Sequence, residues 1–305
     1  MAGKVEFGVF SPQAGLPWTA LLDRAKLADK LGYHSIWITD HMWSRGMPGL
    51  DYHECLAAMT GLAAGTEKIR IGTLVICQSY RNPAILAKAL TTIDHISGGR
   101  LEIGIGAGWM DEEYKAYGFE FPPMGVRLKQ LAEALQIMKA LFTQDRATFK
   151  GRYYSIGDAY NNPKPIQKPH PPIMIGGSGE KVMLRIVARY ADRWNCPAGY
   201  QSFEHKLGVL KEHCKAVNRD INSITISEQL LVCLGTSEAE VEQKWQMATR
   251  FPFAKTGIKG TPAQVVAQLK DRVRLGLQMF TIFFSDLAPP QTLELFANEV
   301  MPAFA

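Results

Sequence analysis

The sequence predicts an α/β fold in which eight parallel strands and their connecting helices close into a (β/α)8 barrel, the TIM barrel architecture. Short apolar runs typical of strands alternate with segments of helical periodicity along all 305 residues. Such alternation implies parallel strands joined by right-handed crossovers. We count eight expected strands, each followed by helix-compatible sequence, and eight is the number of units that closes a barrel.

The first half of the chain contains four of the expected strands and four expected helices. The strands cover residues 5–10, 35–39, 69–76 and 101–105. The helices cover residues 21–31, 53–64, 83–96 and 126–142. Gly32 directly follows the first helix, where glycine is a common C-terminal stop. Pro83 opens the third helix, at a position where its missing N–H costs no hydrogen bond.

A proline-rich stretch at 147–172 then interrupts the alternation. Its prolines, at positions 163, 165, 169, 171 and 172, exclude a helix, and we expect an insertion that wraps over the scaffold. The pattern resumes with a helix at 180–190 and with strands expected at 173–175, 193–196, 224–233 and 278–284. The helix before the last strand opens with Thr261 and Pro262, and Gln264 can close a capping box with Thr261.

We therefore expect one domain over residues 1–305, with the insertion around 147–172 attached to the barrel. The length alone also allows two domains of about 150 residues each. A doubly wound open sheet is the alternative fold, because it uses the same alternation of strands and helices.

The composition excludes several classes of protein. The chain is 47% hydrophobic and 21% charged, which is typical of globular proteins and excludes a disordered, collagenous or coiled-coil chain. Its 34 basic and 29 acidic residues give a net charge of +5 without blocks of like charge, so we expect no nucleic-acid partner. We also expect no membrane association, because no apolar stretch approaches the roughly 18 residues of a membrane helix.

The cysteines and histidines argue against a disulfide framework and a metal site. The five cysteines are odd in number and never spaced as C-x-x-C, which indicates reduced thiols. With no secretion signal at the N-terminus, this favours a cytoplasmic protein. His205, His213 and Cys214 occupy a helical stretch without a third ligand at metal spacing, so we expect no metal.

Two glycine-rich loops follow apolar strands, where barrels place their functional residues. They are Gly106-Ala107-Gly108-Trp109 and Gly176-Gly177-Ser178-Gly179. Glycines let backbone N–H groups face a phosphate, especially where a helix then begins. The first loop is not a dinucleotide fingerprint, because Trp109 stands where the third glycine would fall. We expect a phosphate between the two loops; flexible strand exits are the alternative.

Two other strand ends carry candidate residues. Asp40 and His41 follow the second strand, and a carboxylate beside an imidazole can hold one tautomer of the ring. A hydrogen-bonded loop histidine without a chemical role is the alternative. Gly72 interrupts the third strand, which indicates either close approach of a ligand or simple relief of packing.

Taken together, these motifs resemble the luciferase-like monooxygenase superfamily of flavin and deazaflavin oxidoreductases, and closely its branch that uses coenzyme F420, a deazaflavin. The resemblance covers roughly residues 5–235. The matching stretches are 31–41, 71–75, 80–88, 94–109, 162–167, 172–180 and 190–195.

The resemblance implies a luciferase-like barrel that holds the cofactor ring at the carboxyl ends of its strands. A cis peptide bulge that presses on the ring would fall at Leu74–Val75, next to Thr73. The phosphate-bearing tail would rest on residues 106–108 and 176–179, with Trp109 lining the pocket. His41 would serve as base or anion stabiliser, with Asp40 adjoining it.

One position departs from the sugar-phosphate dehydrogenases of this superfamily. Those enzymes place a catalytic glutamate directly after the Gly-x-Gly of the fourth strand, where this chain has Trp109. Glu112 and Glu113 come several residues later. The sequence therefore argues against a copied sugar-phosphate dehydrogenase mechanism.

The resemblance implies an oxidoreductase that transfers a hydride between F420 and a small organic substrate. The alternative is an FMN-dependent monooxygenase that uses O₂ and receives reduced flavin from a separate reductase. A non-catalytic barrel that binds a flavin or another phosphorylated ligand is a further alternative. The resemblance also makes a homodimer an expected assembly.

Overall fold

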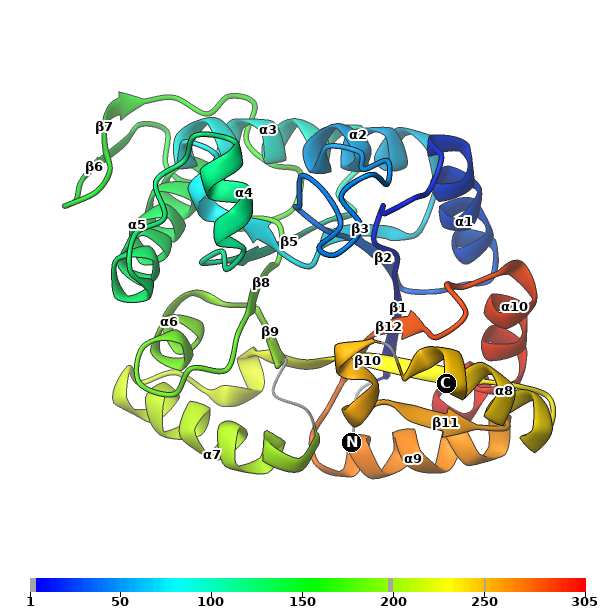
Figure 1. The fold of residues 1–305 in the computed structure, drawn as a ribbon. Coiled ribbons are helices and arrows are strands. Elements are labelled where there is room, and N and C mark those ends of the chain that lie inside the picture. Colours follow the sequence, from blue (N-terminus) through cyan, green and yellow to red (C-terminus); the bar gives the residue numbers. More distant parts are fainter. Residues whose placement is uncertain (1–3, 197–199, 250) are drawn as a thin grey trace.

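Eight parallel strands close into a barrel in the computed structural model, which describes residues 4–196, 200–249 and 251–305 (Figure 1). In order around the barrel they are β1 (Glu6–Phe10), β2 (Ser35–Ile38), β3 (Arg70–Thr73), β5 (Leu101–Gly106), β8 (Ile173–Gly176), β9 (Arg193–Cys196), β10 (Thr225–Leu234) and β12 (Met279–Phe284). Strand β12 pairs with β1 and closes the ring. Two short strands extend this sheet: β4 (Ile76–Cys77) pairs with β5, and β11 (Ile258–Gly260) pairs with β10. The predicted fold class is confirmed.

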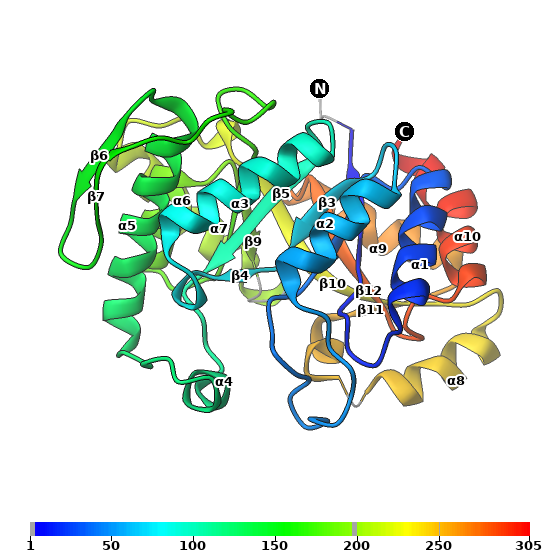
Figure 2. The same ribbon diagram turned by 90° about the horizontal axis from the view of Figure 1, so that it is seen from above.

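Helices surround the strands on all sides (Figure 1). The outer ring consists of α1 (Trp18–Lys30), α2 (Cys55–Gly65), α3 (Pro83–Ile96), α5 (Met124–Thr143), α6 (Met183–Tyr190), α7 (Tyr200–Ala216), α9 (Pro262–Arg274) and α10 (Pro290–Glu299). Two more helices, α4 (Asp111–Ala116) and α8 (Glu238–Ala248), and the loop after β2 lie at the carboxyl ends of the strands, and both termini lie at the opposite end (Figure 2). Short 3-10 turns are η1 (Gln78–Tyr80), η2 (Ile221–Ser223), η3 (Pro252–Thr256) and η4 (Met301–Phe304).

Local sequence signals set several element boundaries as expected. Helix α3 begins at Pro83, and the side chain of the preceding Asn82 accepts hydrogen bonds from the amides of the first turn. Gly32, after α1, adopts a φ of +79°, which favours glycine. At the start of α9, Gln264 accepts a hydrogen bond from the Thr261 amide at 2.9 Å, the contact that the capping-box prediction requires.

Among the boundaries that differ from the sequence-based expectation, two lie beside the carboxyl ends of β3 and β8. The strand expected over 69–76 is interrupted: β3 ends at Thr73 and β4 begins at Ile76, with a cis peptide between Leu74 and Val75. Leu74, Val75 and Ile76, the residues at the break, are all apolar and give no local sign of it. Helix α6 begins at Met183, later than the expected residue 180, because the glycine loop continues into an irregular turn.

The proline-rich insertion at 147–172 contains no helix among its residues, as predicted, but it contains a hairpin that the prediction missed. Strands β6 (Ala147–Lys150) and β7 (Ser155–Ala159) pair antiparallel. Glu133 on α5 accepts hydrogen bonds from the backbone amides of residues 152–154, at the hairpin turn. Asn161 binds the Thr91 hydroxyl on α3 at 2.9 Å. The insertion therefore packs on the outer surfaces of α3 and α5.

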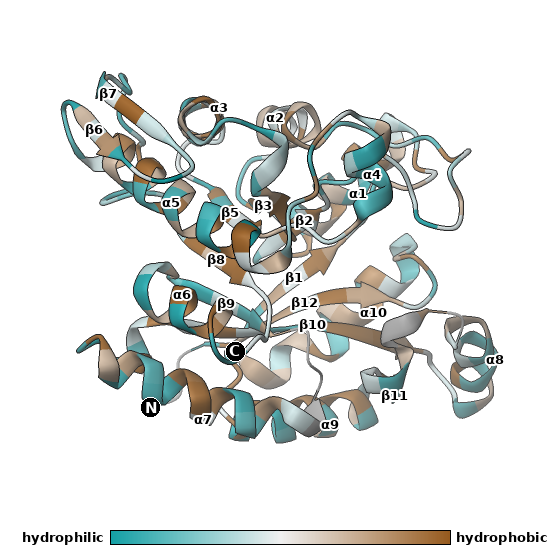
Figure 3. Ribbon diagram, turned by 60° about the vertical axis from the view of Figure 1, so that its left-hand side comes forward, coloured by the Kyte–Doolittle hydropathy of each residue, from teal (hydrophilic) through white to brown (hydrophobic). Residues whose placement is uncertain are grey.

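Alternating side chains on the strands supply two cores, one inside the barrel and one between strands and helices. On β2, Trp37 points into the barrel, whereas Ile36 and Ile38 pack toward the helices. The hydropathy colouring shows the strands as the apolar centre of the molecule (Figure 3). A side chain on Gly72 would collide with the Trp37 ring, so Gly72 provides space for packing. That supports the packing alternative for this glycine.

A buried ion cluster closes the amino-terminal end of the barrel. Glu102 on β5 has no exposed surface and binds Arg70 at 2.5 Å and Arg193 at 2.9 Å. Arg193 also contacts Glu6 at 2.5 Å. Since the four side chains come from β1, β3, β5 and β9, they link strands that lie far apart in the chain.

We expect Glu102→Gln to destabilise the barrel strongly. The amide keeps the shape but leaves Arg70 and Arg193 without their shared countercharge, and breaking a buried ion pair typically costs about 3–5 kcal/mol. The free energy of unfolding in urea measures the loss. Glu212→Gln is the matched control, because its 70% exposed side chain pairs with an equally exposed Lys215 and exposed pairs contribute about 0–1 kcal/mol. Equal losses in the two variants would contradict this role for Glu102.

Candidate active site

The loops singled out in the sequence meet at one end of the barrel. They follow β2, β3, β5 and β8, which are consecutive around the sheet. The two glycine loops follow neighbouring strands, since Ile103 pairs with Ile173 and Ile105 with Ile175. Parallel strands present their carboxyl ends on the same face, so this face is the candidate active site.

The bulge after β3 packs into space left by glycines of the neighbouring strands. A side chain on Gly106 would lie 2.7 Å from one methyl group of Val75, and a side chain on Gly176 would lie 3.2 Å from the other. A side chain on Gly104 would collide with the carbonyl of Thr73, whose hydroxyl in turn donates to the Gly104 carbonyl at 2.8 Å. Several glycines expected to cradle a phosphate therefore accommodate the bulge itself.

The rest of the first glycine loop is also closely packed. Gly108 has a φ of +74°, and a side chain there would collide with the Tyr114 hydroxyl and lie 2.7 Å from Cys77 Sγ. Cys77 and Tyr114 contact each other at 3.0 Å. Burial raises the pKa of Cys77 to about 11, so the thiol stays protonated at neutral pH.

The second glycine loop is the more open of the two. Gly176, Gly177 and Ser178 are partly exposed, and Gly179 is exposed. The loop leads to α6, whose first turn carries no acidic residue and whose N-cap, Val182, offers no side-chain hydrogen bond. Helix α4, after the first loop, begins instead with three acidic residues. The amino end of α6 therefore suits an anion far better than that of α4.

His41 extends from the loop after β2 and is held by a carboxylate from α4. Its Nδ1 lies 2.9 Å from Glu113 Oε2, and its side chain is 25% exposed. The Trp109 ring meets the imidazole edge to face, with 5.5 Å between centroids. His41 therefore has one buried, bonded nitrogen and a partly exposed remainder.

Glu113 is the most heavily hydrogen-bonded side chain of the site. One oxygen accepts from the Met42 amide at 2.6 Å, and the other accepts from the Tyr80 hydroxyl at 2.7 Å as well as contacting His41. Burial alone would raise the pKa of Glu113, but the bonds from His41, Tyr80 and Met42 outweigh it and lower the pKa. The carboxylate is thus ionised at neutral pH.

Asp40 contacts different partners from those expected. Both of its oxygens bind the Arg81 guanidinium, at 2.6 and 2.9 Å, and one also accepts from the Cys77 amide at 2.9 Å. Arg81 continues to Glu54 at 2.5 Å. The expectation that Asp40 orients the adjacent imidazole is corrected: Asp40 connects the end of β2 to β4 and α2, and Glu113 contacts the ring.

Trp109 lies on the exposed side of His41, with 54% of its surface accessible. Arg45 stacks over its ring at 5.3 Å and contacts Glu112 at 3.5 Å. Nearby, Trp43 and Tyr117 stack at 5.8 Å. Aromatic side chains of the loop after β2 and of the residues that flank α4 thus line the surface beside His41, where a planar ligand would find stacking partners.

Sequence reasoning missed Glu113, Tyr80 and Arg81 as site residues. Only a weak signal existed in the sequence: all three are polar and lie in the segments that follow the carboxyl ends of β4 and β5. Spacing could not identify them, since Glu113 is 72 residues from His41 along the chain. Only the fold brings α4 against the loop after β2.

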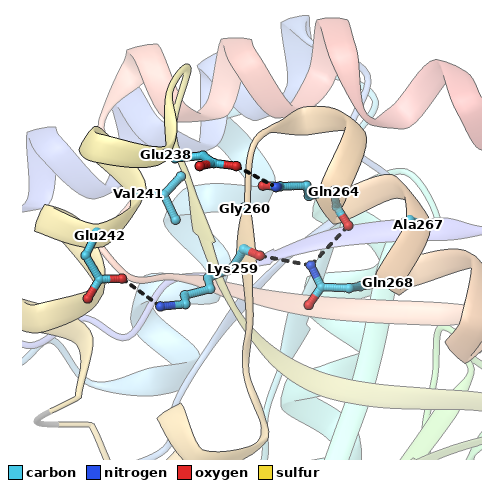
Figure 4. A pocket seen from close by; sticks show the side chains of 8 residues that line it. All are labelled: Glu238, Val241, Glu242, Lys259, Gly260, Gln264, Ala267 and Gln268. Atoms are coloured by element: carbon cyan, nitrogen blue, oxygen red, sulfur yellow. Dashed lines mark hydrogen bonds and ion pairs between the residues drawn. The ribbon is translucent and has the colours of Figure 1, made fainter.

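Other parts of the structure offer fewer functional groups. An open pocket of about 530 Å³ lies on the outer surface between α8, β11 and α9 (Figure 4). Its polar side chains pair among themselves, as in the 2.8 Å contact between Lys259 and Glu242. Within the described ranges, no cluster of His, Cys, Asp and Glu is arranged to hold a metal. None of the helices described has the length and apolar character to cross a membrane.

We expect Gly106→Ala to destabilise the protein by about 1–3 kcal/mol, because the new methyl group must displace Val75. Adding Val75→Ala should recover part of this loss, since it removes the methyl groups that collide. Gly125→Ala, in the first turn of α5 with open space around it, is the control. Thermal unfolding of the three variants and the parent protein tests this, and a double variant no more stable than Gly106→Ala would refute it.

Comparisons with known proteins agree with this architecture. Residues 5–256 match the family described as luciferase-like monooxygenase. The F420-dependent glucose-6-phosphate dehydrogenase of Amycolatopsis mediterranei is 24% identical over 92% of this chain and 93% of its own. The FMNH(2)-dependent dimethylsulfone monooxygenase of Pseudomonas putida is 25% identical over 91% of this chain and 85% of its own.

A solved structure shares the fold over nearly the whole length. It is an F420-dependent secondary alcohol dehydrogenase in complex with an F420–acetone adduct, with a TM-score of 0.87 and 21% identity over 99% of this chain and all of that one. The residues that match the family model, 5–256, include the strand ends that carry the candidate site. The chain belongs to the luciferase-like monooxygenase family and is an oxidoreductase that depends on F420 or a flavin.

Proposed function

We propose that this protein transfers a hydride between coenzyme F420 and a small organic substrate, with His41 exchanging the accompanying proton. The observation that carries the proposal is the position of Leu74 and Val75 at the end of β3, between His41 after β2 and the glycine loops after β5 and β8. When bound, the deazaflavin supplies the hydride chemistry. The remaining tasks belong to side chains and amides of this chain.

The ring would lie against the bulge. Leu74 and Val75 are both partly exposed at the end of a buried strand, and Thr73 behind them is fully buried. A Val75 side chain held by the neighbouring glycines presents a firm apolar surface to a flat ring. Trp109 would flank the ligand on the His41 side.

The phosphate-bearing tail would rest mainly on the loop after β8. Ser178 and Gly179 are accessible there, the first turn of α6 has no acidic residue, and Glu180, which precedes the helix, is paired with Lys206. The loop at residues 106–108 would contribute less to phosphate binding, because it packs against Val75, Cys77 and Tyr114 and leads into the acidic start of α4. It would border the ring instead.

The alternative cofactor is FMN, which the dimethylsulfone monooxygenase relative favours. A flavin mononucleotide also combines a tricyclic ring with a phosphate, so the same bulge and loop would receive it. A monooxygenase would in addition need a separate reductase to deliver reduced flavin. Direct binding measurements distinguish the two cofactors.

We expect the protein to bind F420 at least about tenfold more tightly than FMN, a difference of about 1.4 kcal/mol. Titrating the purified protein into each cofactor and following deazaflavin or flavin fluorescence measures both affinities. Preferential FMN binding would overturn the choice of F420. Binding without substrate-dependent cofactor reduction across a panel of alcohols and other small organic substrates would favour the non-catalytic barrel.

His41→Ala should lower the rate of cofactor reduction at least about a hundredfold, the usual contribution of general acid–base catalysis, while leaving cofactor affinity nearly unchanged. His95→Ala is the control, because His95 lies exposed on α3 and binds the Lys164 carbonyl of the insertion. Stopped-flow reduction under saturating cofactor measures the effect. A His41→Ala enzyme as fast as the control would exclude proton exchange at His41.

A further inference from the structure

We propose that Glu113 is a positioning residue that holds His41 as the Nδ1–H tautomer, so that Nε2 is the nitrogen that exchanges the proton, and that Tyr80 moderates this effect. The inference rests on the proposed role of His41 and extends it to two residues outside its own loop. It follows from the way hydrogen-bond donors are distributed around one buried carboxylate.

The hydrogen-bond partners of Glu113 are groups that donate, so its carboxylate acts as an acceptor. Its side chain has no exposed surface, and its Oε1 accepts from the Met42 amide at 2.6 Å. Its Oε2 lies 2.9 Å from His41 Nδ1 and 2.7 Å from the Tyr80 hydroxyl. An ionised carboxylate carries no proton to donate, so the proton between Glu113 and His41 belongs to Nδ1.

Fixing the proton on Nδ1 determines the chemistry of the other nitrogen. In a neutral imidazole with Nδ1 protonated, Nε2 carries the free lone pair and can accept a proton. The bonded nitrogen faces a fully buried side chain, so the 25% of His41 that is exposed lies on the rest of the ring. The negative charge of Glu113 also stabilises the imidazolium that forms when Nε2 is protonated.

Tyr80 hydrogen bonds to the same oxygen of Glu113, Oε2, and weakens the effect of this carboxylate on His41. Its hydroxyl donates to Oε2, and burial together with this bond raises the pKa of Tyr80 far above its usual value, so it remains a donor. A second donor on Oε2 reduces the charge available to His41. Loss of the Tyr80 hydroxyl should therefore strengthen the bond between Glu113 and the imidazole.

The other titratable groups around the loop of His41 have partners of their own. On its own loop, Asp40 binds Arg81, and Arg45 contacts Glu112 of α4 at 3.5 Å. Behind the loop, Tyr52 bonds to the Thr39 hydroxyl, and Cys77 contacts Tyr114. Among the described residues, Glu113 is the carboxylate in contact with the ring, which makes it the residue to substitute.

The first test is nitrogen NMR of histidine-labelled protein without cofactor. The parent protein should show the Nδ1–H tautomer for His41. In Glu113→Gln the Met42 amide requires an oxygen at the Oε1 position, so the new NH₂ group faces His41 and should reverse the tautomer. The pKa of His41 should also fall by roughly one pH unit, the lower end of the effect of a neighbouring charge.

Tyr80→Phe supplies an independent variant with the opposite prediction. The pKa of His41 should rise and the Nδ1–H tautomer should persist, whereas Tyr80→Phe in the Glu113→Gln background should give no such rise. Glu112→Gln, one residue away on α4 and half exposed, should leave both the tautomer and the pKa unchanged. An unchanged tautomer and pKa in Glu113→Gln, or a lowered pKa in Tyr80→Phe, would overturn the proposal.

Turnover measurements separate this inference from the proposed function. The pH profile of cofactor reduction should move down in Glu113→Gln and up in Tyr80→Phe, in step with the NMR titration. If the NMR results hold but His41→Ala retains full activity, Glu113 fixes the tautomer and the catalytic role of His41 is wrong. If the pH profiles shift without any change in the tautomer or pKa of His41, the positioning role of Glu113 is wrong.

Discussion

The geometry of the active face depends on how Val75 packs against glycines of the neighbouring strands. Gly106 and Gly176 leave room for its methyl groups, and Gly104 leaves room for the carbonyl of Thr73. Because β3, β5 and β8 are adjacent, the bulge, both glycine loops and the start of α4 are placed relative to one another by this single packing arrangement.

Buried carboxylates perform different tasks at the two ends of the barrel. Glu102, at the amino-terminal end, is neutralised by two arginines and ties strands together. Asp40, at the other end, is likewise neutralised by Arg81. Glu113 is stabilised by a tyrosine, an imidazole and an amide, none of which carries a permanent charge. Its negative charge therefore remains available to act on His41.

Much of the architecture could be predicted from local patterns. Strand β9 and helix α3 have the predicted bounds, because their apolar periodicity and caps are contained within a few consecutive residues. Resemblance to a family located the cis peptide at Leu74–Val75, which no local pattern marks. The hairpin β6–β7 was missed, since its strands are short, mostly exposed and bound to α5 through Glu133.

The order of apolar strands and amphipathic helices was sufficient to specify an α/β barrel and to place its functional loops on one face, because side-chain periodicity and strand direction are local properties. The partner of His41 was not specified in this way. The neighbouring Asp40 looked suitable, yet it forms an ion pair with Arg81, and Glu113 contacts the ring from helix α4. Hydrogen-bond partners of buried ions depend on which segments the fold brings within about 3 Å, and no spacing along the chain encodes that distance.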